Sequence, residues 1–262
     1  MSYRKPIQLI QPTTSYGVIL FTVDNSSGRN EIKYQIQQRR DSISFQEFMK
    51  DTIPVKDIER HISLMSREER KRCIDYYLKD DPESLWDDLW VNHKCKIYKT
   101  DKERCCQAFK KNMEKYKDLF LDERGGTPEN PWGFAKGRKR YGESSRDCAF
   151  REFEEETTIS RRCVQELKIS PYEEIFNGSD GNPYKTVLYV AYIPYIPHIT
   201  IKKTPLNIRK NYISDEVSEL DWCTYVECIG KLDSRKCLIL KDLNKKLLFS
   251  RNRKPPPRRF TN

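Results

Sequence analysis

Residues 137–159 read GRKRYGESSRDCAFREFEEETTI, and this stretch decides the fold. It holds six carboxylates, and four of them fall within the five positions 152–156. Ser144 followed by Asp147 predicts a helix from about Ser144 to Thr157, opened by a capping box in which Asp replaces the commoner Glu. The chain is basic overall, so this concentration of negative charge needs an explanation.

The glutamates of this helix share one face. Glu152, Glu155 and Glu156 lie within about 100° of one another around the axis. Phe150 and Phe153 point elsewhere and can pack against a core. Like charges at these spacings destabilise a helix by roughly a few tenths of a kcal/mol per pair, so a function should offset the repulsion. Three carboxylates on one face suit Mg²⁺ or Mn²⁺, although a solvated acidic face is the commoner alternative.

The whole stretch resembles the Nudix box, G-x5-E-x7-R-E-U-x-E-E-x-G-U, in which U is bulky and apolar. The matching residues are Gly137, Glu143, Arg151, Glu152, Phe153, Glu155, Glu156 and Ile159. Thr158 stands where the family has Gly, which usually ends the helix in the left-handed conformation. Because Thr adopts that conformation poorly, we expect the end of the helix to differ here.

The resemblance implies a hydrolase of nucleoside diphosphates linked to another group, assisted by metal ions. It implies that Glu155 and Glu156 bind metal and that Glu152 is a ligand or the general base. The Gly137 carbonyl would add a ligand. Arg151 would belong to the same catalytic group. A further match, Glu143, would pair with Arg151 and so orient the glutamates.

Two further sets of residues extend the predicted site. The stretch DEVSELDW (215–222) resembles a strand of the family whose Glu binds metal or acts as base, and that Glu maps to Glu216. Asp215 and Glu219 are neighbours that could be confused with it. Four cations on the loop that enters the helix are expected to meet phosphate oxygens, unless the loop is simply solvated: Lys136, Arg138, Lys139 and Arg140.

The order of elements predicts an α+β fold, a Nudix α/β/α sandwich with an inserted helical domain. Strands are expected at 15–24, 33–38, 162–170, 185–194 and 217–223, and a last helix at 235–249. The predicted divisions are 1–45 for the first strands, 46–122 for the helical insertion, 123–249 for the catalytic part and 250–262 for a basic, Pro-rich disordered tail.

The stretch QQRRDSISFQEFM (37–49) resembles the R-R-x-S-x-x-[FY]-x-E segment of decapping enzymes of poxviruses and other large DNA viruses, which also carry a helical insertion. This implies capped mRNA as substrate, with m7GDP and 5′-monophosphate RNA as products. Methylated guanine is flat and cationic and favours aromatic rings. Tyr189 is the first candidate ring and Phe45 or Phe48 the second, although these rings could equally be core; Trp132 is expected in the core.

Charge supports an anionic partner. The chain has 49 Lys and Arg against 39 Asp and Glu, a net charge of +10. Basic runs at 67–72 and 109–117 and the tail are expected to bind the RNA body without sequence preference. Mixed charge on helices is more often a solvated face, and the tail could instead be a localisation segment.

The nine cysteines form no C-x2-C pair, and their number is odd, which favours a reducing compartment. No apolar run reaches membrane-spanning length, and no signal peptide opens the chain. We therefore expect a cytoplasmic protein, in the host cytoplasm if the source is viral.

Two other functions stay open. One is a Nudix hydrolase of diphosphoinositol polyphosphates or nucleotide pyrophosphates, which explains the box but not the helical block. The other is a non-catalytic RNA-binding protein on a Nudix fold. Loss of a box carboxylate would mark it, and all of these carboxylates are present.

Overall fold

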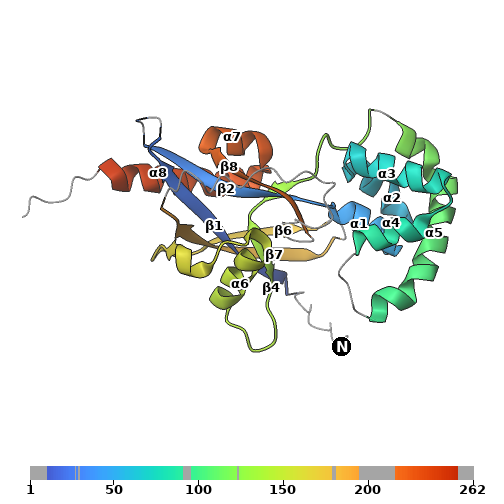
Figure 1. The fold of residues 1–262 in the computed structure, drawn as a ribbon, viewed down its shortest axis with the longest axis horizontal. Coiled ribbons are helices and arrows are strands. Elements are labelled where there is room, and N and C mark those ends of the chain that lie inside the picture. Colours follow the sequence, from blue (N-terminus) through green and yellow to red (C-terminus); the bar gives the residue numbers. More distant parts are fainter. Residues whose placement is uncertain are drawn as a thin grey trace, which may run out of the picture.

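The computed structural model describes residues 11–252 apart from 27, 29, 91–95, 123, 179–180 and 195–215. The predicted tail beyond residue 252 and the alternative acid Asp215 therefore lie outside the described residues. A twisted sheet flanked by helices forms one part, and a group of helices lies beside it (Figure 1). None of the described helices is both long enough and apolar enough to cross a bilayer.

Eight strands make up the described sheet. They are β1 (Thr13–Asp24), β2 (Glu31–Arg39), β3 (Trp132–Gly133), β4 (Ala135–Arg138), β5 (Gln165–Glu166), β6 (Tyr172–Asn177), β7 (Pro183–Tyr192) and β8 (Val217–Thr224). β1 pairs antiparallel with β2 and parallel with β7. The outer neighbour of β2 is β8, and that of β7 is β6.

The two central strands part along their length. β1 and β2 pair only where residues 21–24 face residues 31–34. Farther along, β3 pairs with β2 and β4 pairs with β1, so this short segment lies between the diverging strands. The sheet therefore opens toward the helical part (Figure 1).

Helices cover both faces of the sheet. α6 (Ser145–Thr157) packs on one face through Phe150 and Phe153, which join Val18 and Leu20 of β1 in a buried cluster. On the other face lie α7 (Tyr225–Lys231) and α8 (Ser234–Asn252), whose core includes Tyr34 and Leu240. These layers confirm the predicted α/β/α sandwich of the α+β class.

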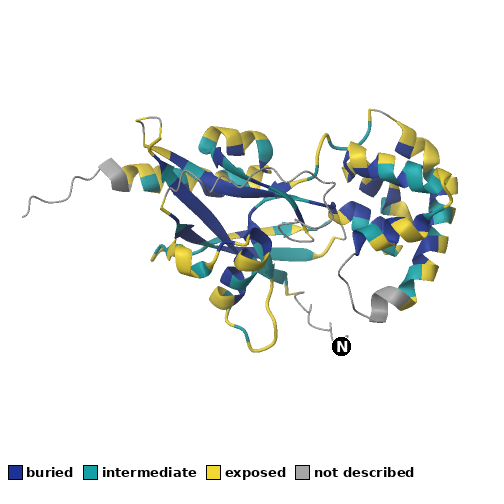
Figure 2. Ribbon diagram, viewed as in Figure 1, coloured by how far each residue is buried: buried dark blue, intermediate teal, exposed yellow. Residues whose placement is uncertain are grey.

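The helical insertion lies between β2 and β3 and has its own core. It contains α1 (Ile43–Lys50), the 3₁₀ helix η1 (Val55–Asp57), α2 (Ile58–Leu64), α3 (Arg67–Leu78), α4 (Pro82–Leu89) and α5 (Lys96–Leu121). Figure 2 shows buried residues gathered separately inside the sheet part and inside the helical part. Ser42 caps α1, and a reciprocal Ser66–Glu69 box caps α3. Such caps typically stabilise a helix by about 1 kcal/mol.

The insertion leaves the sheet and returns to it at neighbouring points. The backbone N–H of Arg39 donates to the carbonyl of Pro131 (3.1 Å), and Asn130 Nδ2 donates to the carbonyl of Arg40 (2.7 Å). The buried Arg40 side chain then reaches the carbonyl of Leu89 at the end of α4 (2.8 Å). It also pairs with Asp41 (2.7 Å). Residues 39–41 and 130–131, where the chain leaves the sheet and returns to it, therefore form a hydrogen-bonded junction.

One predicted strand is wrong. Residues 162–170 form the 3₁₀ helix η2 (Arg161–Cys163) and the two-residue β5 rather than a long strand. The antiparallel partner of β7 is β6, which the sequence analysis did not identify. The reason is that β6 reverses the usual pattern: Glu174 is buried, whereas Ile175 is 64% exposed.

Candidate active site

Helix α6 begins at the predicted residue. The Ser144 hydroxyl accepts the backbone N–H of Asp147 (3.0 Å), which satisfies one free donor of the first turn. The Asp147 carboxylate bonds the Ser144 hydroxyl (2.6 Å) and pairs with Arg161 (3.0 Å). The start of α6 therefore has one of the two bonds of the predicted capping box, the one that Ser144 accepts. The Asp147 carboxylate bonds the Ser144 hydroxyl.

The end of α6 contradicts our expectation for Thr158. This residue adopts the left-handed conformation (φ 60°, ψ 7°), and its N–H donates to the Glu154 carbonyl (2.9 Å), as a Gly would. The conformation costs roughly 1 kcal/mol for a residue with a Cβ. Neighbouring bonds hold it: the Thr157 hydroxyl accepts the N–H of Ile159 (3.2 Å), and the Glu154 carboxylate accepts that of Arg161 (2.6 Å).

Arg151 joins the carboxylates of the box. Its Nε and Nη2 donate to Glu143 (2.7 and 2.9 Å), in a two-pronged pair. Its Nη1 donates to Glu152 (2.7 Å) and to Glu155 (3.0 Å). Arg140 adds a bond to the other oxygen of Glu155 (2.8 Å). These pairs offset the repulsion between the glutamates, so Arg151 and Glu143 lie where orienting groups are expected.

Glu143 is held in its charged form. The Arg151 guanidinium and the backbone N–H of Arg140 lower the pKa of the Glu143 carboxyl to about 2. The same bond with Glu143 raises the pKa of Arg151 above its already high ordinary value. This pair therefore stays ionised throughout the physiological range and fixes the orientation of Arg151.

Gly137 touches the Glu152 carboxylate directly. A Cβ built on Gly137 would overlap the carboxyl carbon and both carboxyl oxygens of Glu152. The Gly137 carbonyl accepts a weak bond from the buried Cys148 thiol (3.6 Å). With any Cβ at residue 137 the Glu152 carboxylate would have to move, so glycine lets the predicted carbonyl ligand lie beside a predicted carboxylate ligand in its present position.

Glu156 lies deeper than the other glutamates of the box, with 7% of its surface exposed. One oxygen accepts the Gln37 amide (2.7 Å) and the backbone N–H of Lys136 (2.9 Å). Burial raises the pKa of Glu156 to about 7, and the Glu216 charge contributes in the same direction. Glu156 thus connects α6 to β2 and β4 at the point where the sheet opens.

Glu216 reaches the site through an irregularity in the sheet. The pairing of β2 with β8 shifts between Gln38 and Arg39, so Ser218 is an extra residue in β8. Ser218 donates to the carbonyls of Gln38 and Arg39 (both 3.3 Å). Glu216 Oε2 then lies 4.0 Å from Arg39 Nη2, with 62% of its side chain exposed.

The oxygen donors fit a hard cation. Within the described ranges, no three Asp, Glu, His or Cys side chains converge in an arrangement that could hold a metal ion. Arg151 and Arg140 occupy both oxygens of Glu155. The available donors are nevertheless carboxylate and carbonyl oxygens, which Mg²⁺ and Mn²⁺ prefer. Each Glu155 oxygen accepts one arginine bond and keeps a second lone pair, so the carboxylate can bind a cation while Arg151 and Arg140 stay in place.

The predicted phosphate-binding cations do not share one loop. Lys136 and Arg138 belong to strand β4, and only Lys139 and Arg140 lie on the exposed loop that follows. Lys139 lies over the ring of Tyr16 (5.9 Å), and Arg140 pairs with Glu155. The prediction of a single basic loop is therefore wrong in its placement, and Lys136 is the member that points into the fold.

Tyr189 lies on the face of the sheet covered by α6. It stands opposite Val18 in the β7–β1 pairing and is half-buried against the cluster that contains Phe150. Burial and the nearby Glu166 charge raise the pKa of the Tyr189 hydroxyl, and Arg146 also lies nearby. The ring thus lies near Arg146 in the first turn of α6, and its stacking on a cap stays a prediction.

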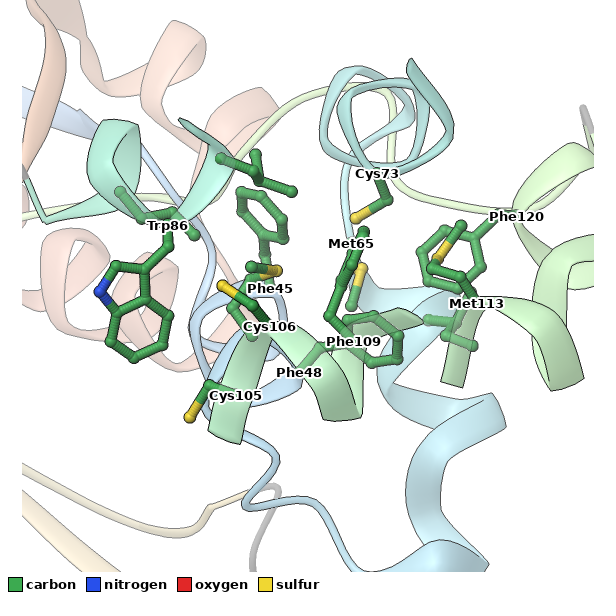
Figure 3. Close-up of a cluster of buried hydrophobic side chains, with 14 of the residues drawn as sticks. Phe45, Phe48, Met65, Cys73, Trp86, Cys105, Cys106, Phe109, Met113 and Phe120 are labelled. Atoms are coloured by element: carbon green, nitrogen blue, oxygen red, sulfur yellow. The ribbon is translucent and has the colours of Figure 1, made fainter. Parts of the chain in front are cut away.

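Phe45 and Phe48 lie elsewhere. Figure 3 shows both rings inside the core of the helical part, among residues such as Phe109 and Met65. Phe45 is 0% exposed and Phe48 is 2% exposed. The Phe48 ring packs edge-on against Phe109, with 6.0 Å between the centroids. Because neither ring has a free face, their burial argues against stacking on a cap, and the core alternative describes them. Trp132 is also in a core, as predicted.

Sequence reasoning missed two residues of the site, Gln37 and Arg39. Both lie in the quoted segment 37–49 but outside the box. The available signal was alternation, because Gln35, Gln37 and Arg39 share one face of β2. Two adjacent polar positions of that face, Gln35 and Gln37, are buried, at 5% and 8% exposure.

The chain is similar to a known protein family and to proteins from two viruses. The family model described as NUDIX domain matches residues 109–243, just over half of the chain. A protein of Acanthamoeba polyphaga mimivirus named "Putative mRNA-decapping protein" is 28% identical over 229 residues, which cover 78% of this chain and 61% of that protein. The chain thus spans less than two thirds of the mimivirus protein.

The mRNA-decapping protein g5R of African swine fever virus is 25% identical over 244 residues, which cover 89% of this chain and 94% of that protein. Among solved structures, an Ap4A hydrolase of C. elegans superposes with a TM-score of 0.46 and 10% identity, over 90% of this chain and 98% of that one. At that TM-score the likeness supports no conclusion about function.

Proposed function

Because the chain belongs to the NUDIX family, we propose that it is a metal-dependent mRNA-decapping hydrolase that releases m7GDP and 5′-monophosphate RNA. The observation that carries the proposal is the extent of similarity to a viral protein named for mRNA decapping. That similarity covers 89% of the chain, far more than residues 109–243, so it includes much of the helical part. A small-molecule Nudix hydrolase has no evident use for that part.

The oxygen donors described above would hold Mg²⁺ or Mn²⁺. These are the carboxylates of Glu152, Glu155 and Glu156 and the carbonyl of Gly137. When bound, the cation neutralises charge on the pyrophosphate and lowers the pKa of a coordinated water. Arg151 and Glu143 orient the ligands, because Arg151 contacts both Glu152 and Glu155 while Glu143 holds its other nitrogens.

Two carboxylates are candidates for the general base. The Glu152 carboxylate is held in place by its ion pair with Arg151 and by its contact with Gly137. Glu216 is 62% exposed and lies at the open end of the sheet, 4.0 Å from Arg39. Measuring kcat against pH for Glu152→Gln and Glu216→Gln separates them, because loss of the base removes the rise of kcat with pH, whereas loss of an orienting or metal-binding group does not.

Substrate recognition divides between the two parts of the molecule. Tyr189 is our cap-stacking ring, since it combines a partly exposed aromatic face with a position beside α6. The helical part would bind the RNA body. Within its first basic run, Arg70 is buried and Arg72 pairs with Asp41 and Asp88, which leaves Arg67 and Lys71 exposed. The second run exposes Lys111, Lys115 and Lys117. We propose that these exposed cations contact phosphates.

The test uses RNA labelled in the cap phosphates. Wild-type protein with Mg²⁺ or Mn²⁺ is expected to release m7GDP, and Glu155→Gln is expected to abolish the release. Glu154→Gln is the matched control, because it removes the same charge from a position about 100° around α6, where Glu154 bonds Ser160 and Arg161 instead of the arginines of the box.

Three other outcomes carry different meanings. Hydrolysis of a diphosphoinositol polyphosphate with no cleavage of capped RNA would replace the proposal with the small-substrate alternative. RNA binding without any hydrolysis would favour the non-catalytic alternative. Release of m7GDP that survives Glu155→Gln would contradict the placement of the metal ligands. We propose that the protein acts on mRNA in the cytoplasm, in the host cytoplasm if the source is viral.

A further inference from the structure

Tyr141 lies at the tip of the loop that joins β4 to α6. Its side chain is fully exposed (108%), so no other described residue covers the ring. Residues 138–142 are all exposed. Figure 1 shows this loop projecting from the sheet part, and Figure 2 shows its exposed surface. Single exposed apolar side chains are common on protein surfaces, so exposure alone assigns the ring no function.

A tight turn fixes the backbone of Tyr141. The N–H of Glu143 donates to the Arg140 carbonyl (3.2 Å), which closes a four-residue turn around Tyr141 and Gly142. Gly142 has a φ of 76°, as the second central residue of a type II turn does. The Glu143 carboxylate closes the turn a second time by accepting the N–H of Arg140 (3.0 Å). The turn therefore holds the ring outward on a backbone that is already ordered.

The same turn is bonded to the predicted active site. Glu143 accepts two bonds from Arg151 (2.7 and 2.9 Å), and Arg151 also donates to Glu155 (3.0 Å). Arg140, the first residue of the turn, donates to the other oxygen of Glu155 (2.8 Å). Tyr141 therefore directly follows a residue whose side chain reaches a proposed metal ligand.

Positive charge leads up to the ring. Arg138, Lys139 and Arg140 directly precede Tyr141, and all three are exposed. Arg140 is engaged by Glu155, whereas Lys139 lies over the ring of Tyr16 (5.9 Å). Proteins that bind single-stranded nucleic acid combine cations, which attract the phosphates, with exposed aromatic rings, on which the bases stack. This loop has both components.

We propose that Tyr141 stacks on a base of the RNA chain beside the capped end, with Arg138 and Lys139 contacting the neighbouring phosphates. The inference deepens the proposed function and rests on it only in that the substrate is single-stranded RNA. Stacking of this kind tolerates any sequence, because every base has a π-face. The ordered turn suits the role, since little backbone freedom is lost when the base binds.

The test measures binding of a dye-labelled, uncapped single-stranded RNA by fluorescence anisotropy. Tyr141→Ala is expected to weaken binding about 5- to 100-fold, the loss for one stacked base. Tyr141→Phe keeps the ring and should bind as wild type does, whereas Tyr141→Leu keeps only apolar surface and should lose affinity. Val226→Ala is the control, because it removes an exposed apolar side chain (76%) from α7, on the other face of the sheet.

Two comparisons identify what the ring contacts. If Tyr141 stacks on the RNA body, Tyr141→Ala weakens the binding of capped and uncapped RNA by the same factor. Weakening confined to capped RNA would assign the ring to the cap and overturn the inference. An RNA duplex of the same sequence should bind Tyr141→Ala as tightly as wild type, because its bases are already stacked on one another. An equal loss of affinity for the duplex would show that the ring does not stack on a base.

A structural role for Tyr141 gives a different result. Because the ring packs on no described residue, Tyr141→Ala should keep the urea midpoint of wild type. An affinity for RNA that falls only together with this midpoint would overturn the inference. Undiminished RNA binding by Tyr141→Ala or Tyr141→Leu would also overturn it, as would a wild-type protein that binds no RNA. Wild-type protein that binds RNA through Tyr141 but releases no m7GDP would instead contradict only the decapping proposal.

Discussion

Gly137 in β4 and Glu152 in α6 are in such close contact that a Cβ at residue 137 would overlap the Glu152 carboxylate. The position of this carboxylate thus depends on the missing side chain of Gly137 as well as on the bond to Arg151 (2.7 Å). The box glycine and the box glutamate form one structural unit, although 14 residues separate them in the chain.

Gly137→Ala is therefore expected to displace the Glu152 carboxylate and reduce kcat for m7GDP release by about 100-fold, in line with the sensitivity of catalysis to misplacement of about 1 Å. Gly133→Ala is the matched control, because its added Cβ would meet only Lys236 Cε, at an ordinary 3.7 Å. Equal activity of the two variants would show that Glu152 tolerates displacement.

Arg151→Gln should reduce kcat/KM by about 10- to 100-fold, because three carboxylates lose their common partner. Arg151→Lys should recover little, since an ammonium cannot provide the planar fork that holds Glu143. Arg162→Gln removes an exposed cation from the turn after α6 and serves as control. Steady-state kinetics on a capped RNA substrate measure kcat/KM of each variant. Full activity of Arg151→Lys would show that the planar fork of Arg151 is not required.

Phe48→Ala is expected to lower the free energy of unfolding by about 3–5 kcal/mol, the usual cost of removing a buried Phe side chain. Leu78→Ala, in the same part but 70% exposed, should change it by about 0.5 kcal/mol or less. Urea titrations followed by circular dichroism measure both. If Phe48→Ala raised KM for the cap without any loss of stability, the ring would be a cap ligand after all.

The Glu156 carboxyl predicts a pH dependence of the metal-free protein. Its pKa is raised from an ordinary value of 4.5 to about 7, so the folded protein holds this proton more tightly than the unfolded chain. Its contribution to stability is therefore complete below about pH 4.5 and is lost as pH rises to about 7. The loss is at most about 3 kcal/mol.

Glu156→Gln removes this titration. In a chelator, the variant should gain stability over wild type between about pH 4.5 and 7, and the difference should level off above that range. Unfolding by urea at pH 5 and pH 8 is the measurement. A variant that is less stable than wild type at pH 8 would mean that the bonds to Gln37 and Lys136 outweigh the cost of burying the charge.

Local chemistry made helix α6 predictable, and tertiary contacts determined the parts that were missed. Ser144 signals the start of α6 from the chain alone, but the left-handed Thr158 depends on bonds from Glu154 to the following turn. The strand β6 could not be inferred from hydrophobic pattern, because Glu174 faces inward toward Lys236. Helix α7 was missed although its capping box, Thr224 with Glu227, is legible in the sequence.

The aromatic predictions show the same division. Tyr189 lies in strand β7, and the alternation of residues along a strand predicts which face of the sheet its ring projects from. The spacing of Phe45 and Phe48 instead fits a helix, and their packing partners include Phe109 of α5, which follows Phe48 by 61 residues. The position of Glu216 beside Arg39 depends in turn on β8, in which the extra residue Ser218 shifts the pairing with β2.

The paired crossing at Arg39–Pro131 and Arg40–Asn130 has an evolutionary consequence. A segment whose two ends lie side by side can be gained, lost or exchanged while every strand of the sheet keeps its partners. The helical part is thus a segment that could be replaced without disturbing the strand pairing of the sheet. Under the proposed function, substrate preference could change there while the residues proposed to bind metal keep their positions.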